Sequence, residues 1–411
     1  MSEHDHADRP SAPEGGRPGA PHSAGRTPPA QAGSVREVTL LFLKLGTIAF
    51  GGPAAHTAMM RDELVRRRGW VDDQRFVDLM GATNLIPGPN STELAIHLGY
   101  DRARRRGLIA AGVCFILPAA LIVTALAWAY VTYGNTPAVE GILYGIVPAV
   151  IAIIAHALFG LLRTVIKNLW LAALTVAALT AYLLGVNELL VLAAGALLAA
   201  AARALRRPPT QRGRPHGMLA APLLTAGGLP VFPDPTGGQL AQLFATMLKI
   251  GAVLYGSGYV LLAFLRGDFV DRLGWITNQQ VIDAVSIGQV TPGPVFTTAT
   301  FLGYLVAGPV GAFLATVAIF LPSFVFVGLL TKLTDKLRSS AWTSALLDGL
   351  NAAALALMAG VSFHLGQTAI IDWLTAAIAA LTLMLLWKTR LNNAWFIAAG
   401  AAIGLVHTLL S

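Results

Sequence analysis

The chain has 411 residues, of which 55% are hydrophobic and only 12% are charged. Soluble domains carry roughly a quarter charged residues, so this composition indicates a membrane protein. The net charge of +8 would suit a nucleic-acid partner, but the arginines stand in short clusters beside apolar runs, where they act as topology signals. The single cysteine, Cys114, can form no internal disulfide. A soluble nucleic-acid-binding protein and cysteine-based redox or zinc chemistry are therefore excluded.

Long uncharged runs predict membrane-spanning helices. An apolar stretch of more than about 18 residues is long enough to cross a bilayer. Four stretches contain no charged side chain: 107–139, 284–331, 349–371 and 391–411. We therefore expect an all-α polytopic membrane protein, embedded in a lipid bilayer and without a nucleic-acid partner.

Two polar segments divide the chain. Residues 1–34 are rich in proline and glycine with almost no large apolar side chain, which predicts a disordered tail. Residues 204–238 are basic and again rich in proline and glycine, which predicts a cytoplasmic linker. The membrane regions are then a first repeat at 35–203 and a second repeat at 239–411.

The two membrane regions repeat each other. When the sequence is shifted by 205 residues, Lys44 falls on Lys249, and the Pro-Gly-Pro sequence at 87–89 falls on the one at 292–294. The register continues between these positions without a gap. Chance matches do not keep one register over such a distance, so the sequence predicts a tandem duplication.

The distribution of arginine indicates that the repeats are inverted. Arginines flank the first Pro-Gly-Pro segment on both sides, whereas the equivalent stretch of the second repeat is nearly neutral. Because basic loops lie in the cytoplasm, the two segments are expected to open toward opposite faces. Each repeat is predicted to have a leading span (36–54 and 239–262), a Pro-Gly-Pro re-entrant hairpin and four further spans. Five crossings give inverted-topology repeats and place the N-terminus outside.

The Pro-Gly-Pro segments are the first candidate site. Proline and glycine break a helix, and irregular backbone at membrane depth persists only where protein shields it or where it lines a polar cavity. Polar residues follow each break, as is usual where a helix begins. Backbone N–H groups at a helix start bind anions, and two such ends near the midplane would form a transporter-type substrate site. A structural proline kink is the alternative.

A second break, rich in small residues, lies in the leading span of each repeat and allows close approach of a ligand or of another helix. Lys44 and Lys249 precede these breaks in apolar surroundings, so each either attracts the anion or snorkels to the interface. The candidate substrate-binding residues of the first repeat are Lys44, Gly51, Gly52, Pro53, Asn84, Pro87, Gly88, Pro89, Asn90, Ser91 and Thr92. Those of the second repeat are Lys249, Gly256, Ser257, Gly258, Gln289, Thr291, Pro292, Gly293, Pro294 and Thr297.

Other ionisable residues lie near these segments. Glu93 follows the first Pro-Gly-Pro and is a candidate proton carrier, with a helix-dipole partner as the alternative. His56 has no equivalent, since Leu261 occupies that place, and is expected to lie at the interface. Asp78 and Asp283 are equivalent and are expected to cap helices.

These motifs resemble those of the chromate ion transporter family. The resemblance rests on Phe50-Gly51-Gly52-Pro53 with His56, the Trp70 loop, the run PGPNSTELA from Pro87, Gly99-Tyr100 and FILP around Pro118. It covers nearly the whole chain after the tail and implies the full-length, two-domain form. The family implies efflux of chromate across the bacterial inner membrane, chromate resistance, and sulfate as a competitor. The pattern is fainter in the second repeat, where Val295 replaces Asn90, so whether the two repeats bind equally stays open.

The sequence argues against other function classes. It contains no Gly-x-Ser-x-Gly, no His-Glu-x-x-His and no P-loop. We therefore expect no enzyme, no catalytic residue, no metal, no cofactor and no internal use of ATP. A transporter or channel for another anion, such as sulfate, is the main alternative, followed by a membrane-embedded enzyme. The oligomeric state and the coupling ion stay open.

Overall fold

The computed structural model describes residues 34–50, 52–134, 136–205, 237–255, 260–337, 341–389 and 391–410. All of them belong to one unit, Ala32–Ser411. They form helices joined by turns, and no strand occurs within the described ranges. The all-α prediction is confirmed for this part of the chain, and most of the predicted tail and linker lies outside it.

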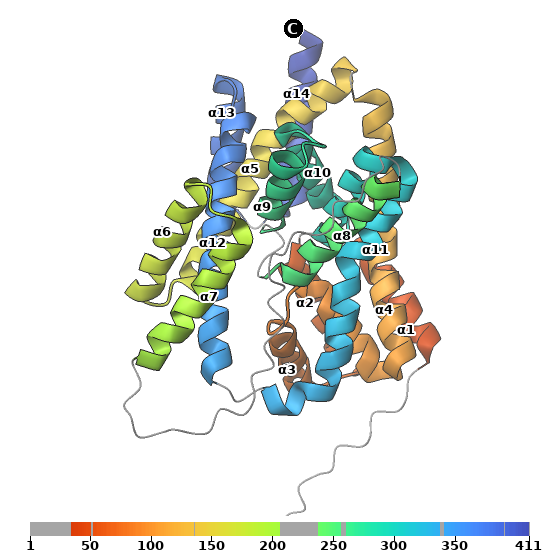
Figure 1. Cartoon of the computed structure of the whole chain (residues 1–411). Helices are drawn as coiled ribbons and strands as arrows, with labels where there is room; N and C mark the ends of the chain where they lie inside the picture. The colour runs from red at the N-terminus through yellow and green to blue at the C-terminus, as the bar shows by residue number, and fades with distance from the viewer. Residues whose placement is uncertain are drawn as a thin grey trace, which may run out of the picture. The chain divides into compact units, whose positions relative to one another are not determined.

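The helices follow the same order in both repeats (Figure 1). The first repeat contains α1 (Val35–Ile48), α2 (Gly52–Arg61), the π-helix η1 (Asp62–Arg67), α3 (Asp73–Thr83), α4 (Asn90–Tyr133), α5 (Pro137–Val165), α6 (Leu169–Leu183) and α7 (Glu188–Leu205). The second contains α8 (Gly237–Val253), α9 (Leu261–Leu265), the π-helix η2 (Arg266–Arg272), α10 (Asn278–Val290), the 3-10 helix η3 (Val295–Thr297), α11 (Thr298–Leu337), α12 (Ala341–Ala369), α13 (Trp373–Lys388) and α14 (Asn393–Leu410).

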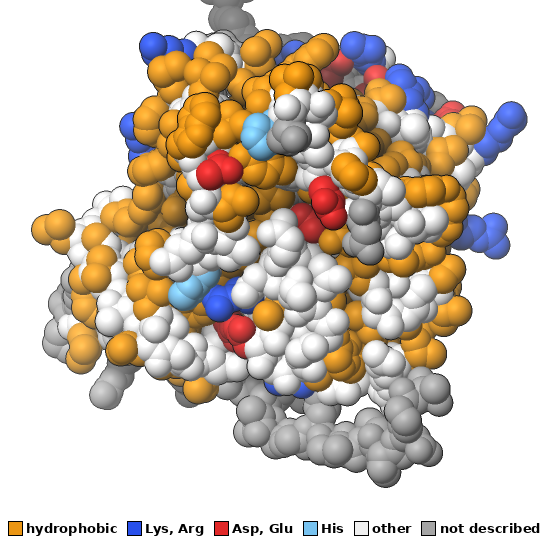
Figure 2. Space-filling view, turned by 90° about the horizontal axis from the view of Figure 1, so that it is seen from above, with side chains coloured by type: hydrophobic (Ala, Val, Ile, Leu, Met, Phe, Trp, Pro, Cys, Tyr) orange, Lys and Arg blue, Asp and Glu red, His pale blue; other side chains and the backbone are white. Residues whose placement is uncertain are grey.

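Six of the described helical segments are long and apolar enough to cross a membrane. They are α4, α5, α7, Val295–Thr331, Ala345–Ala369 and α14. Many large apolar side chains stay exposed on these helices, for example Leu121 of α4 and Phe313 of α11. Figure 2 shows hydrophobic side chains covering much of one face, with acidic and histidine side chains set among them. The protein is a multi-pass membrane protein.

The long helices α4 and α11 bend at equivalent places. Arg104 has φ 52° and ψ −142°, and Gly308 has φ 59° and ψ −151°. The bend brings Gly99 against Gly107, since a Cβ on Gly99 would lie 2.4 Å from the Gly107 carbonyl oxygen. Residues eight apart in a straight helix would be about 12 Å apart. Each helix therefore consists of a short first stretch, a reversal and a long second stretch.

The helices at the predicted leading spans are shorter than those spans. α1 has 14 residues and is therefore about 21 Å long, less than the roughly 30 Å hydrocarbon core. After the Gly-Gly-Pro break the chain folds back along it, because Lys44 of α1 lies beside Glu63 of η1. The second repeat folds back in the same way, with Lys249 of α8 beside Asp268 of η2.

The first repeat has two short hairpins, one formed by α1, α2 and η1 and the other by α3 and the first stretch of α4. Three contacts hold the ends of these hairpins together on one face of the repeat. Arg102 forms an ion pair with Glu37 at 3.0 Å and lies 4.9 Å from the Trp70 ring. Arg75 forms an ion pair with Asp101 at 2.8 Å. These residues come from the beginnings of α1 and α3, the loop after η1 and the end of the first stretch of α4. The start of α1 thus lies beside the loop after η1 and the end of the first stretch of α4, whereas a single leading crossing would place the start of α1 on the face opposite that loop.

The two repeats interleave. α5 packs against α13 and α14, and α12 packs against α6 and α7. Glycines permit the close approach: Gly145 of α5 meets Gly400 of α14, and Gly349 of α12 meets Gly195 of α7. At the centre, α4 packs against α11, and their long stretches run in opposite directions (Figure 1). The helix breaks of the two repeats meet beside this pair.

Candidate functional site

Each Pro-Gly-Pro turn bonds to the helix break of the other repeat. The N–H of Gly88 donates to the carbonyl of Leu254 at 2.8 Å, and the N–H of Gly293 donates to the carbonyl of Ala49 at 2.9 Å. Gly88 is equivalent to Gly293, and Ala49 to Leu254. A pair of contacts exchanged in this way is what a twofold operation between the repeats produces. The predicted turns therefore come together at the contact between repeats.

Glycine is required at the centre of both turns. Gly88 has φ +135° and Gly293 has φ +95°, in the region that side chains disfavour. A Cβ on Gly88 would lie 2.1 Å from Glu93 Oε1, and one on Gly293 would lie 2.7 Å from the Ala119 Cβ. Backbone conformation and packing thus both exclude a side chain at these two positions.

Helix α4 begins at Asn90, as predicted, directly after the first Pro-Gly-Pro. The N–H groups of Thr92 and Glu93 bond to the carbonyl of Pro89 at 2.7 and 3.1 Å. Among the described residues, this leaves the N–H groups of Asn90 and Ser91 as first-turn donors without a backbone acceptor. The Asn90 side chain donates to the Asn84 side chain at 2.7 Å, so these two candidate residues meet.

The second helix start differs in its hydroxyl groups. The 3-10 helix η3 precedes α11, and the hydroxyl of Thr297 donates back to the carbonyl of Pro294 at 2.8 Å. The hydroxyl of Thr291 likewise donates to the carbonyl of Ile287. By contrast, the buried Thr92 hydroxyl of the first repeat has no partner among the described residues, and neither has the amide nitrogen of Gln289.

Glu93 is fully buried beside the first turn. Its Oε1 accepts a hydrogen bond from the Ser323 hydroxyl of α11 at 3.3 Å, and its Oε2 has no partner in the described part of the chain. Thr298 is the equivalent of Glu93 in the second repeat, and Ala119 is the equivalent of Ser323 in the first. Ser323, which the sequence did not single out, therefore belongs to the site; the Pro-Ser pair in register with Pro118 was its available signal.

His56 is buried, with 1% of its surface exposed, so its predicted interfacial location is wrong. Its Nε2 lies 3.0 Å from the carbonyl of Ala49, and its Nδ1 lies 3.2 Å from the hydroxyl of Ser91. A carbonyl only accepts, so Nε2 carries the hydrogen and Ser91 donates to Nδ1. The Ala49 carbonyl accepts from both His56 and Gly293, which links the first repeat's histidine to the second repeat's turn.

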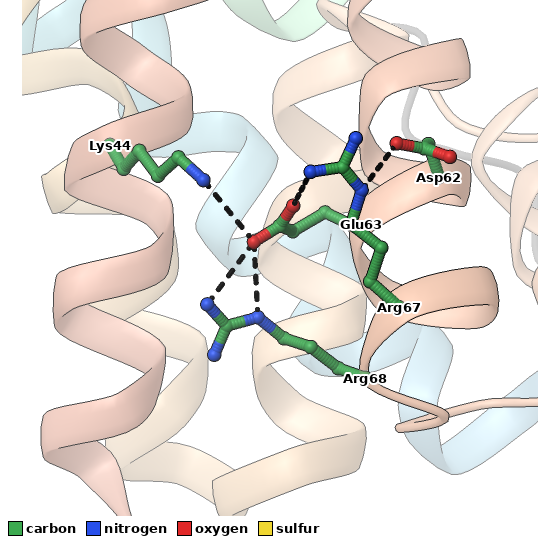
Figure 3. Close-up of polar contacts among 5 residues, drawn as sticks. All are labelled: Lys44, Asp62, Glu63, Arg67 and Arg68. Atoms are coloured by element: carbon green, nitrogen blue, oxygen red, sulfur yellow. Dashed lines mark hydrogen bonds and ion pairs between the residues drawn. The ribbon is translucent and has the colours of Figure 1, made fainter.

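The two candidate lysines form ion pairs within their own repeats, and Figure 3 shows that of Lys44. Lys44 Nζ lies 3.4 Å from Glu63 Oε1, which also accepts from Arg68 at 3.1 Å. Lys249 Nζ lies 2.6 Å from Asp268. Burial opposes ionisation of Glu63, but the hydrogen bonds from Arg68 and Lys44 outweigh it and lower the pKa of the carboxyl. Neither acid was predicted from the sequence, although Glu63 and Asp268 are in the same register.

A family model described as chromate transporter matches residues 36–200 and again residues 241–405. The chain belongs to the chromate transporter family. The two matches have the predicted spacing, which confirms the duplication. Family membership also confirms that this protein is a transporter and not an enzyme. No solved structure gives a significant match.

Named relatives cover almost the whole length of this family member. The "Chromate transport protein" of Cupriavidus metallidurans is 36% identical over 391 residues, which are 93% of this chain and 96% of that protein. The "Probable chromate transport protein" of Synechococcus elongatus is 33% identical over 91% of this chain and 95% of that protein. The "Chromate transport protein" of Pseudomonas aeruginosa is 31% identical over 88% and 90% of the two chains.

The remaining candidates of this transporter lie apart from the two turns or outside the described residues. The caps of α3 and α10 are Asp72 and Thr277, so the capping role expected for Asp78 and Asp283 is wrong. Asp283 instead accepts from Tyr130 of α4 at 2.8 Å. Gly52 (φ +79°) and Pro53 begin α2. Gly51, Gly256, Ser257 and Gly258 lie outside the described residues.

Proposed function

We propose that the protein is a secondary transporter that exports chromate across the bacterial inner membrane and so gives chromate resistance. The observation that carries the proposal is the exchanged pair of hydrogen bonds, from Gly88 to Leu254 and from Gly293 to Ala49. It brings two broken helices to the contact between two halves, where secondary transporters hold their substrates. The relatives named as chromate transport proteins support the choice of anion.

The two halves are inverted-topology repeats in this proposal, each with a re-entrant Pro-Gly-Pro hairpin. Support comes from the exchanged contacts and from the opposite directions of α4 and α11. The arginine-rich face of the first repeat, which carries the Trp70 loop, is then cytoplasmic. The equivalent Trp275 loop lies on the outer face.

Labelling of single cysteines tests this topology. Cysteines would be placed in the Trp70 and Trp275 loops of a Cys114→Ser background and modified with a membrane-impermeant maleimide in sealed, oriented vesicles. We expect each loop to be modified from a different side. Modification of both loops from the same side would exclude inverted repeats while leaving the transport activity open.

The anion is held by the start of α4 and by the Pro-Gly-Pro turns, with the lysines adding positive charge nearby. Asn90 and Ser91 offer backbone N–H groups at the positive end of the helix dipole. In the packed arrangement Gly88 touches Glu93 and Ser323, so α4 and α11 have to separate locally to admit a tetrahedral oxyanion. The proposed substrate-binding residues are those identified from the sequence in both repeats.

The membrane potential supplies a driving force for export. Moving one elementary charge across 100 mV is worth about 2.3 kcal/mol, so expulsion of a dianion from a cell that is negative inside is favourable by about twice that. Glu93 is a candidate for a second driving force, the coupling of anion export to proton movement. An ionised carboxylate without a cationic partner is costly to bury, and protonation of the group removes that cost.

Flux in proteoliposomes tests the function. Radiolabelled chromate and sulfate would be followed in vesicles of known orientation, with the membrane potential and the pH gradient set separately. We expect saturable chromate flux that increases with the potential and is competed by sulfate. Flux that rises linearly with concentration would indicate a channel, and sulfate flux without chromate flux would assign a different anion.

A further inference from the structure

Three ionisable side chains lie one helical turn apart in the first stretch of α4. Glu93, His97 and Asp101 are spaced by four residues, and the backbone is helical from Asn90 to Arg102. Side chains at this spacing lie on one helix face, with about 6 Å between neighbours. The row therefore extends from the Pro-Gly-Pro turn to the arginine-rich face of the first repeat.

Burial decreases along this row. Glu93 is 0% exposed and His97 is 1% exposed, whereas the Asp101 side chain is 17% exposed and pairs with Arg75, whose side chain is 46% exposed. The row thus connects a fully buried carboxyl to an ion pair at the surface.

The two buried members have unused hydrogen-bonding atoms. Within the described ranges, neither His97 Nδ1 nor His97 Nε2 has a partner, and Glu93 Oε2 has none. An unmade hydrogen bond on a buried polar atom costs roughly 1–3 kcal/mol, so a purely structural role would favour apolar side chains here. Imidazole is suited to carry protons near neutral pH, since one nitrogen can accept while the other donates.

The surroundings leave this row without a competing charge. Asp101 and Arg75 are the charged groups that act on His97. Glu93 faces Ser323 of α11 and, at longer range, Tyr255 after α8. The charged groups of the other packed helices have their own partners. In α1, Glu37 pairs with Arg102 and Lys44 pairs with Glu63. Elsewhere, Arg61 of α2 pairs with Asp73, Asp78 of α3 bonds to Gln74, and Asp283 of α10 bonds to Tyr130 and Gln279. His56 of α2 bonds to Ser91 and Ala49.

The second repeat lacks the row altogether. Thr298 is equivalent to Glu93, and Leu305 is equivalent to Asp101 in the register that places Gly99 on Gly303. The position equivalent to His97 is also apolar, being Phe301 or Leu302 according to where the one-residue deletion between Glu93 and Gly99 is placed. The helix stretch itself and its bend are duplicated, so its backbone geometry alone does not call for acids and a histidine. The row is therefore a property of the first repeat.

We propose that Glu93, His97 and Asp101 form a proton path that couples anion export to proton release at the arginine-rich face. The inference rests on the proposed transport function. Glu93 gives its proton to one ring nitrogen of His97, and the imidazolium then releases the proton from its other nitrogen toward Asp101 and water. Glu93 becomes a carboxylate, one proton reaches the aqueous face, and ring tautomerisation restores His97. The first repeat thus carries the proton, while both repeats hold the anion.

Simultaneous measurement of proton and chromate flux tests the path. The full-length protein would be placed in proteoliposomes containing a pH-sensitive dye, with a chromate gradient and a potential clamped by potassium and valinomycin. The variants are His97→Gln, His97→Asn and Glu93→Gln. His156→Gln is the matched control, because His156 of α5 also has a buried ring nitrogen without a partner but lies off the row.

We expect the wild type and His156→Gln to move protons in a fixed ratio to chromate. Both His97 variants should keep potential-driven chromate flux but lose at least tenfold in proton flux, and Glu93→Gln should move no protons. Wild-type chromate flux without proton flux, or an unchanged ratio in a folded His97 variant, would overturn the path but not the transport function. Absence of any anion flux in the wild type would overturn both.

Discussion

The surroundings of the two Pro-Gly-Pro turns differ in chemistry but not in backbone. Gly88 and Gly293 both have positive φ, and both donate across the contact to the other repeat. Around the first turn lie a buried glutamate, a serine and a histidine, whereas threonine, alanine and leucine occupy the equivalent positions around the second. Because each turn bonds to the other repeat, both turns need the same backbone geometry. The ionisable groups make no such exchanged contact, so they can occur around one turn alone.

The largest expected effect comes from filling the turns. Gly88→Val and Gly293→Val should each reduce chromate flux by more than tenfold per inserted protein, because a β-branched side chain fits neither the backbone angles nor the space. Flux in proteoliposomes, normalised to inserted protein, is the measurement. Gly160→Val is the control, since a Cβ there meets nothing within 4 Å. Normal flux in Gly293→Val would show that the second turn is dispensable. The two repeats would then differ in their need for the turn's backbone geometry as well as in their ionisable groups.

The lysines give the next comparison. Replacement of Lys44 or Lys249 by methionine should weaken chromate binding by about 1–3 kcal/mol, or about five- to 150-fold, if the ammonium groups attract the anion. Stability should fall more for Lys249→Met, since Lys249 is 29% exposed against 50% for Lys44 and exposed pairs contribute little. Chromate affinity and thermal unfolding in detergent would be measured together.

A double variant separates the two roles of Lys44. Lys44→Met with Glu63→Gln removes the pair without leaving a carboxylate behind. If the lysine acts only through its pair, the double variant should bind chromate normally. Its stability should stay below that of the wild type, because Glu63→Gln also removes the ion pair with Arg68. Unchanged affinity in both single lysine variants would leave anion recognition to backbone N–H and hydroxyl groups.

Removal of the Ser323 hydroxyl tests the asymmetry around the first turn at a smaller scale. Ser323→Ala takes from Glu93 its hydrogen bond across the repeats, so stability should fall by about 1 kcal/mol and the proton-to-chromate ratio should change. Ser362→Ala is a suitable control, because that hydroxyl donates only to the carbonyl of Met358 in its own helix. An unaltered ratio would separate Ser323 from proton coupling.

The smallest effect on stability is expected from lowering the pH. The pKa of Glu63 is lowered in the folded protein from the ordinary value of 4.5. Its contribution to stability is therefore complete above that ordinary pKa and is lost as the pH falls through the lowered one. Unfolding in detergent between pH 6 and pH 3 should show a steeper loss in the wild type than in Glu63→Gln. Parallel curves would mean that this ion-pair cluster adds nothing.

Local features of the sequence predicted much of the fold. Uncharged runs located the long helices, and the Pro-Gly-Pro sequence located the start of α4 at Asn90. Hydropathy could not distinguish a leading crossing from a short helix that turns back, because both are apolar; the turn depends on the contact of Lys44 with Glu63. The burial of His56 was also not predictable, since it arises from contacts with Ala49 and with Ser91, which is far from it in the sequence.

The exchanged hydrogen bonds give each repeat one backbone contact of the same kind with the other repeat. If transport tilts one repeat against the other about their twofold relation, the same operation that exchanges the repeats also exchanges the inward-open and outward-open states. Contacts common to both repeats then contribute equally to the free energies of the two states, so they cancel in the difference between those free energies. The populations are then set by positions where the repeats differ, such as Glu93 against Thr298. One unit of pKa difference between two states corresponds to about 1.4 kcal/mol, or a tenfold change in population. Binding or release of one proton is therefore enough to shift the ratio of the two states.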